Sequence, residues 1–126
     1  MILERAAHED TASTGDAPFE EGACRFLEAI VAAALGAQLA DLRARTRGRQ
    51  PVAAARQTMM YLAHVKLGLN LTRVGELFGR DRTTVAHACA CVEDSRDDPN
   101  RDRVLACLET ALDAWRQGFG AGSAAR

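Results

Sequence analysis

Aromatic residues, lysine and long apolar runs are all scarce in this chain. Six of the 126 residues are aromatic, which suits a small core and argues against a large ligand pocket. The longest apolar run, 29–37, is too short to span a bilayer, and no charged start followed by an apolar run indicates a signal peptide. The one lysine, Lys66, lies outside any phosphate-binding loop of the GxxxxGKS/T type. We therefore expect a cytoplasmic protein that binds neither membrane nor nucleotide and needs no cofactor.

The cysteines are few and poorly spaced for a disulfide framework or a metal site. They stand at Cys24, Cys89, Cys91 and Cys107. His87 and Cys91 are four apart and would share a helix face, but no nearby residue completes a metal-ligand set. No general base or oxyanion group accompanies these residues, so packing is the better interpretation and we expect neither a metal site nor an enzyme.

Charge is unevenly distributed along the chain, although the net charge is only −1. The segment Arg43–His87 holds nine basic and two acidic residues, a charge of +7, and the remainder holds seven basic and fifteen acidic residues. Such a basic segment is typical of a polyanion binder, with a solvated basic face as the alternative.

The apolar spacing predicts an all-α protein, a small helical bundle without strands. Apolar residues recur at intervals of three and four, and Gly, Pro or capping residues mark the ends of each run. The predicted helices are 19–35, 38–43, 52–67, 71–78, one that begins after Asp81 and ends near 93, and an added C-terminal helix at 101–117. We predict a flexible segment at 1–17, a helical DNA-binding domain at 18–117 and a flexible tail at 118–126.

The segment Leu69–Glu93 reads as two short helices joined by a tight turn, a helix-turn-helix at about 70–95. The second helix opens with the polar run 80–84, Arg-Asp-Arg-Thr-Thr, backed by apolar residues. Such a helix N-terminus suits a reader of the DNA major groove, because its side chains can meet base edges and its amides favour phosphate.

Arginines stand at every second position before this unit, at Arg43, Arg45, Arg47 and Arg49. This spacing fits an extended arm better than a helix, on which the four side chains would spread around the axis. An extended arginine arm beside a reading helix commonly enters the minor groove, and a solvated loop is the alternative.

The run GRDRTTVAHAC at 79–89 resembles the GRDHTTVxHAC motif in the C-terminal DNA-binding domain of DnaA, the bacterial replication initiator. The basic run RARTRGRQ, the stretch VAAARQTMMYLA and the helix LTRVGELFG precede it in the order that the family shows. The resemblance covers about 29–94.

The resemblance implies roles for particular side chains. Base contacts would come from Asp81, Arg82, Thr83 and Thr84, since threonine offers a hydroxyl and a methyl and aspartate accepts from cytosine. Phosphate contacts would come from Arg56, Gln57, His64, Arg80 and His87. Arg47 or Arg49 would supply the minor-groove arm.

Four departures from the family pattern affect these expectations. Arg82 replaces the usual histidine, the turn FGRD is one glycine short, His64 replaces a lysine, and Gly48 replaces an arginine. The chain also holds no nucleotide-binding module of the kind that precedes this domain in an initiator.

We therefore predict sequence-specific binding of double-stranded DNA at DnaA-box-like sites, in the regulation of replication initiation or transcription near the nucleoid. The alternative is a protein-interaction module of the replication machinery that keeps the fold, with the Trp115 helix and the acidic ends as its contact surface. The sequence fixes neither the oligomeric state nor a protein partner.

Overall fold

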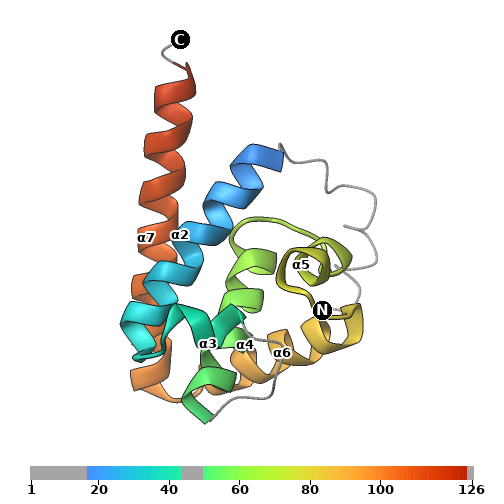
Figure 1. Ribbon diagram of the computed structural model, residues 1–126. Helices are drawn as coiled ribbons and strands as arrows, with labels where there is room; N and C mark the ends of the chain where they lie inside the picture. Colours follow the sequence, from blue (N-terminus) through green and yellow to red (C-terminus); the bar gives the residue numbers. More distant parts are fainter. Residues whose placement is uncertain (1–16, 44–49, 125–126) are drawn as a thin grey trace.

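The computed structural model describes residues 17–43 and 50–124, and in these ranges it contains helices and no strand (Figure 1). The helices are α2 (Ala17–Leu35), α3 (Leu39–Arg43), α4 (Gln50–Val65), α5 (Leu71–Phe78), α6 (Arg82–Ser95) and α7 (Pro99–Ala124). The all-α helical bundle predicted from the sequence is confirmed. The arm residues Arg47 and Arg49, and nearly all of the segment predicted to be flexible at 1–17, lie outside the described residues.

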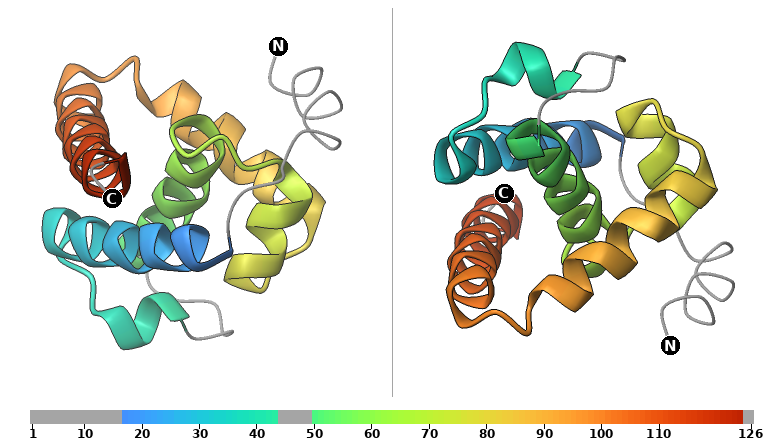
Figure 2. Two further views of the ribbon diagram at one scale, coloured as in Figure 1. Left: turned by 90° about the horizontal axis from the view of Figure 1, so that it is seen from above. Right: turned by 90° about the horizontal axis from the view of Figure 1, so that it is seen from below.

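Helix α4 is the centre of the bundle, with α2, α3, α5 and α6 packed around it (Figure 2). Its apolar residues Val52, Ala55, Met59, Leu62 and Ala63 are buried. Met60 and Tyr61, on other sides of the helix, are also buried, at 4% and 2% exposure. Because α4 is covered on nearly all sides, polar residues on it are buried as well, and this affects two of the predicted phosphate contacts.

The bounds of the short helix α5 agree with the prediction, because its local signals are strong. The Asn70 side chain accepts a hydrogen bond from the Arg73 amide at 2.8 Å, which caps the N-terminus. Gly79 ends the helix in the left-handed region, at φ 69°, a conformation that favours glycine. The other helices begin or end within a few residues of their predicted bounds, apart from the end of α7.

Helix α7 continues to Ala124, whereas we predicted it to end at Gln117 and to be followed by a flexible tail at 118–126. The prediction relied on the glycines after Gln117. Once a helix is nucleated, each added residue gains a backbone hydrogen bond at low entropic cost, so an existing helix can extend through residues that would not start one.

Helix α7 is attached to the bundle by a buried stripe and an aromatic cluster. Leu105, Leu108 and Leu112 are all 4% exposed or less. The Trp115 ring stacks on Phe26, with 5.6 Å between ring centroids, and lies 5.4 Å from the Phe19 ring. These contacts place α7 beside α2, as both views in Figure 2 show.

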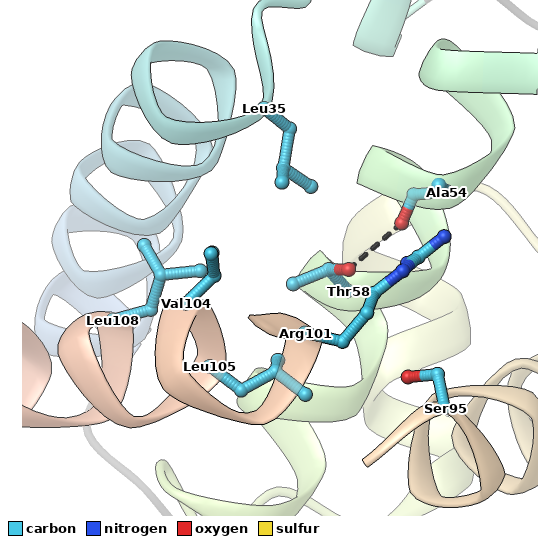
Figure 3. A pocket seen from close by; sticks show the side chains of 8 residues that line it. All are labelled: Leu35, Ala54, Thr58, Ser95, Arg101, Val104, Leu105 and Leu108. Atoms are coloured by element: carbon cyan, nitrogen blue, oxygen red, sulfur yellow. Dashed lines mark hydrogen bonds between the residues drawn. The ribbon is translucent and has the colours of Figure 1, made fainter. Parts of the chain in front are cut away.

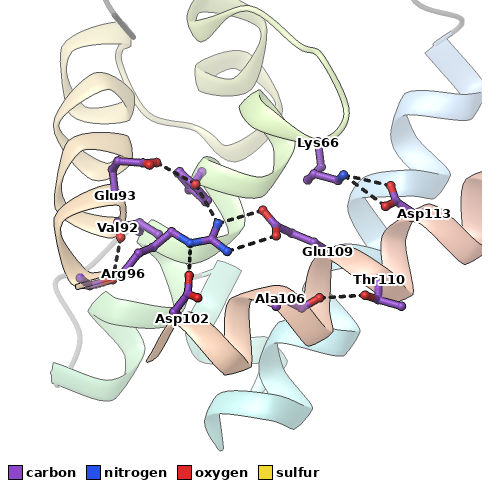
Figure 4. A network of polar contacts seen from close by, with 11 residues as sticks. Lys66, Val92, Glu93, Arg96, Asp102, Ala106, Glu109, Thr110 and Asp113 are labelled. Carbon is purple, nitrogen blue, oxygen red and sulfur yellow. Dashed lines mark hydrogen bonds and ion pairs between the residues drawn. The ribbon is translucent and has the colours of Figure 1, made fainter. Parts of the chain in front are cut away.

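A polar network around Arg96, the C-cap of α6, adds a second attachment (Figure 4). The Arg96 guanidinium donates to both carboxylate oxygens of Glu109, at 2.9 and 3.2 Å, and to Asp102 Oδ1 at 2.6 Å. It also donates to the hydroxyl of the buried Tyr61, which donates to Glu93 at 2.8 Å. Hydrogen bonding, above all to Glu109, raises the pKa of Arg96, so α4, α6 and α7 meet at a permanently charged guanidinium.

Candidate nucleic-acid interface

The turn between α5 and α6 is tight because two glycines allow it. Gly79 supplies the left-handed residue, and the Arg80 amide donates to the Gly75 carbonyl at 2.9 Å. A Cβ atom on Gly75 would overlap the Arg80 carbonyl oxygen, so only glycine at this position permits the approach. Sequence reasoning overlooked Gly75, and a glycine inside a short predicted helix was the available signal.

The start of α6 presents polar side chains to solvent. Arg82, Thr83 and Thr84 are exposed, whereas the next residue, Val85, is completely buried. Asp81 caps the helix by accepting from the Thr84 amide at 2.7 Å, as the sequence predicted. That bond stabilises the charged carboxylate and lowers the pKa of Asp81 below its ordinary value of 3.8. The predicted base-contacting residues are therefore adjacent and accessible on one helix turn.

The back of α6 is fixed in the core, which holds the exposed N-terminus in place. Val85, Ala88, Cys89 and Val92 are buried and recur at intervals of three and four, as the apolar backing of this helix requires. Burial raises the pKa of Cys89 to about 12, and that of Cys24 to about 11, so both thiols stay protonated. Neither cysteine is placed or charged to act as a nucleophile.

Two arginines approach each other near this turn. Arg56, on α4, is 9% exposed and donates to the Asp41 carbonyl at 2.6 Å. Burial, followed by the positive charge of Arg80, lowers the pKa of Arg56. Arg80 in turn donates to the Phe78 and Gly79 carbonyls at 3.3 and 3.1 Å. Because the two charges repel, an anion placed beside both would lower the free energy of the pair.

His64 is buried in this conformation, and its phosphate contact stays a prediction. The side chain is 2% exposed, and its Nδ1 lies 2.7 Å from the Leu69 carbonyl oxygen. The cause of the burial is the central position of α4, whose neighbours cover the position at which the resemblance implies a phosphate contact. Here His64 holds the loop after α4.

The remaining predicted phosphate contacts are accessible. His87 is exposed and follows Thr83 by four residues, so the two share a face of α6. The His87 Nε2 atom lies 3.4 Å from Cys91 Sγ. Gln57 is half-buried beside Arg56. Among the residues described here, no three histidine, cysteine or acidic side chains gather as metal ligands would.

A part-buried ion pair that the sequence did not reveal holds α5 against α2. Glu20 is 3% exposed, and its Oε1 accepts from Arg73 Nε at 2.8 Å. Arg73 also pairs with Glu76 at 3.1 Å. Because Glu20 and Arg73 are far apart in sequence, no local pattern could pair them. The pair fixes the first helix of the helix-turn-helix.

None of the helices in the described ranges combines the length and the apolarity that crossing a membrane requires.

Comparison with known proteins identifies relatives of this segment. A family model described as the bacterial dnaA protein helix-turn-helix matches residues 26–92. A chromosomal replication initiator protein DnaA of Laribacter hongkongensis is 38% identical over 77 residues, 60% of this chain and 16% of the relative. That of a Picosynechococcus strain is 44% identical over 61 residues, 48% of this chain and 13% of the relative. The chain thus spans under a fifth of either relative. The segment that the family model matches ends before α7.

Proposed function

The chain belongs to the bacterial DnaA helix-turn-helix family, and on that premise we propose that it binds double-stranded DNA at DnaA-box-like sites. The observation that carries this proposal is the exposed, capped start of α6, at Asp81–Thr84, above a buried back. The family is one of DNA-binding domains without the ATPase module. The proposed role is therefore binding and regulation, not catalysis.

In this proposal the N-terminal turn of α6 enters the major groove. Thr83 and Thr84 offer hydroxyl groups for base edges and methyl groups for thymine. Arg82, an exposed guanidinium, favours the two acceptors of guanine, where the family motif has histidine. The Asp81 carboxylate already accepts one hydrogen bond from the Thr84 amide, and its remaining lone pairs suit a cytosine amino group.

Phosphate groups on either side of the groove would be held by basic and polar side chains around this turn. Arg56 and Arg80, whose charges repel in the unbound protein, suit one phosphate. His87 and Gln57 are accessible for further contacts. In this proposal the basic arm, through Arg47 or Arg49, contacts the adjacent minor groove of the DNA.

The proposed biological role is supported by the relatives, which are named as chromosomal replication initiators. A domain that recognises the same sites would regulate replication initiation or transcription by occupying them. The alternative, a protein-interaction module centred on Trp115, has less support, because the Trp115 ring packs against Phe19 and Phe26 within the chain.

The decisive experiment compares Thr83→Ala with the matched control Thr110→Ala on a DnaA-box duplex and on a scrambled duplex. Thr83 is the better test residue because Thr84 also takes part in the Asp81 cap. Loss of one base contact costs ~1–3 kcal/mol, about 5- to 150-fold in affinity for the specific duplex. Thr110, exposed on α7, should leave both affinities unchanged. Equal losses on both duplexes for Thr83→Ala would show that this residue does not read bases.

A further inference from the structure

A cavity of about 220 Å³ lies where α7 meets the ends of α2 and α4, away from the start of α6 (Figure 3). Its lining residues come from α2, α4, α6 and α7; they are Leu35, Ala54, Thr58, Ser95, Arg101, Val104, Leu105 and Leu108. Half of them belong to α7, which lies outside the segment that the family model matches. The cavity is therefore formed only when α7 is docked.

The walls of the cavity are largely apolar. The large apolar residues of the lining are Leu35 from α2 and Val104, Leu105 and Leu108 from α7, and Val104 is 36% exposed. The two hydroxyl groups in the lining bond to backbone carbonyls, Thr58 to Ala54 at 2.8 Å and Ser95 to Val92 at 2.6 Å. Because these donors are already satisfied, the walls suit a hydrocarbon chain better than a polar ligand.

Arg101 is the one charged residue in the lining. Figure 3 shows its side chain reaching from α7 towards Ala54 on α4. Among the side chains that the structure describes, at 18–43 and 52–118, none makes a hydrogen bond, ion pair or ring contact with its guanidinium. A planar guanidinium with unused donors beside an apolar cavity is complementary to a carboxylate that carries a hydrocarbon tail.

The volume limits the size of this ligand. A water molecule in the liquid occupies about 30 Å³, so a cavity of about 220 Å³ has room for about seven groups of that size. A methylene group is of similar size, so the cavity fits a chain of roughly six to eight carbons. We propose that the cavity binds a small amphiphilic carboxylate, with its carboxylate on Arg101 and its chain against Leu35, Val104 and Leu108. The ligand contacts both α2 and α7 and stabilises the docked position of α7. This proposal is independent of DNA binding.

The test is titration of the whole chain, without DNA, with sodium octanoate up to roughly 10 mM, where a ligand of this size saturates a genuine site. Amide chemical shifts and calorimetry report binding. We expect saturable binding with shifts centred on Ala54, Val104 and Leu108. Octanol, which lacks the charge, and octylammonium, which reverses it, should each bind at least about tenfold more weakly.

Two exposed arginines on α7 provide the matched variants, and neither substitution removes a core contact. Arg101→Gln should weaken octanoate binding by at least about tenfold and leave octanol binding unchanged. Arg103→Gln, which removes the same charge two residues further along α7 and outside the lining, should bind octanoate as the wild type does. Absence of saturation, equal binding of octanol and octanoate, or equal losses in the two variants would each overturn the proposal.

Discussion

Replacement of Gly75 by alanine should destabilise the protein, although alanine is the better helix former. Gly75 lies inside α5, and a Cβ atom there would overlap the Arg80 carbonyl oxygen. The overlapped atom belongs to the backbone, so no side-chain rotation can relieve the contact. The turn would have to move by about 1 Å to restore a normal separation, and α6 would move with it.

The magnitude can be worked from three contributions. Overpacking costs about 1–3 kcal/mol, and loss of the hydrogen bond from the Arg80 amide to the Gly75 carbonyl costs about 1 kcal/mol. The helix propensity of alanine offsets about 1 kcal/mol. The net loss is therefore about 1–3 kcal/mol, which lowers the Tm of a domain of this size by about 5–15 °C.

Gly22→Ala is the matched control for this substitution. Gly22 also lies inside a helix, α2, but a Cβ there would meet the Trp115 ring at 3.9 Å, an ordinary van der Waals contact. This variant should gain up to about 1 kcal/mol. Calorimetric unfolding of the two variants and the wild type is the assay. A Tm for Gly75→Ala equal to or above that of the wild type would refute the argument from close approach.

Three further outcomes are expected. Folding lowers the pKa of Asp81, so the charged carboxylate stabilises the fold fully at pH values above its ordinary pKa of 3.8, and this contribution is lost as the pH falls through the lowered pKa. The Tm difference between wild type and Asp81→Asn should therefore shrink in acid. A Tm difference that stays constant with pH would contradict this. At mildly alkaline pH a thiol reagent should modify the exposed Cys107 well before the buried Cys24 and Cys89, as mass spectrometry would show, and native-state labelling of Cys89 at the rate of Cys107 would contradict its burial. Arg56→Met should weaken binding to all DNA sequences and reduce the log–log salt slope by ~1, whereas an unchanged slope would remove Arg56 from the phosphate contacts.

Local signals made the helix-turn-helix predictable from the sequence. Asn70 and Asp81 cap their helices, Gly79 ends α5, and the four buried positions of α6 follow the apolar spacing. Each of these signals operates within a few residues of the chain, so a single sequence carries it. The fold class and the accessible start of α6 followed from these signals.

The features that sequence reasoning missed depend on packing between distant segments. The resemblance implied a phosphate contact for His64, which stands where the family has a lysine, but the burial of His64 depends on the packing of other helices around nearly all sides of α4. The Glu20–Arg73 pair joins α2 to α5, and nothing in either segment specifies the other. The role of Gly75 depends on the position of a turn five residues away.

The attachment of α7 has a consequence for how the native protein opens. Undocking α7 exposes three buried leucines, which costs about 2 kcal/mol of free energy for each side chain. It also breaks ion pairs, which cost less because their side chains are already partly hydrated. Removing α4 would expose the whole core. We therefore expect α7 to open as a separate cooperative unit. Its amide hydrogens should exchange through this sub-global opening, whereas those of α4 should exchange only when the whole protein unfolds. The cavity that contains Arg101 exists only in the closed state of this unit, so occupancy of the cavity would appear first as slower exchange along α7.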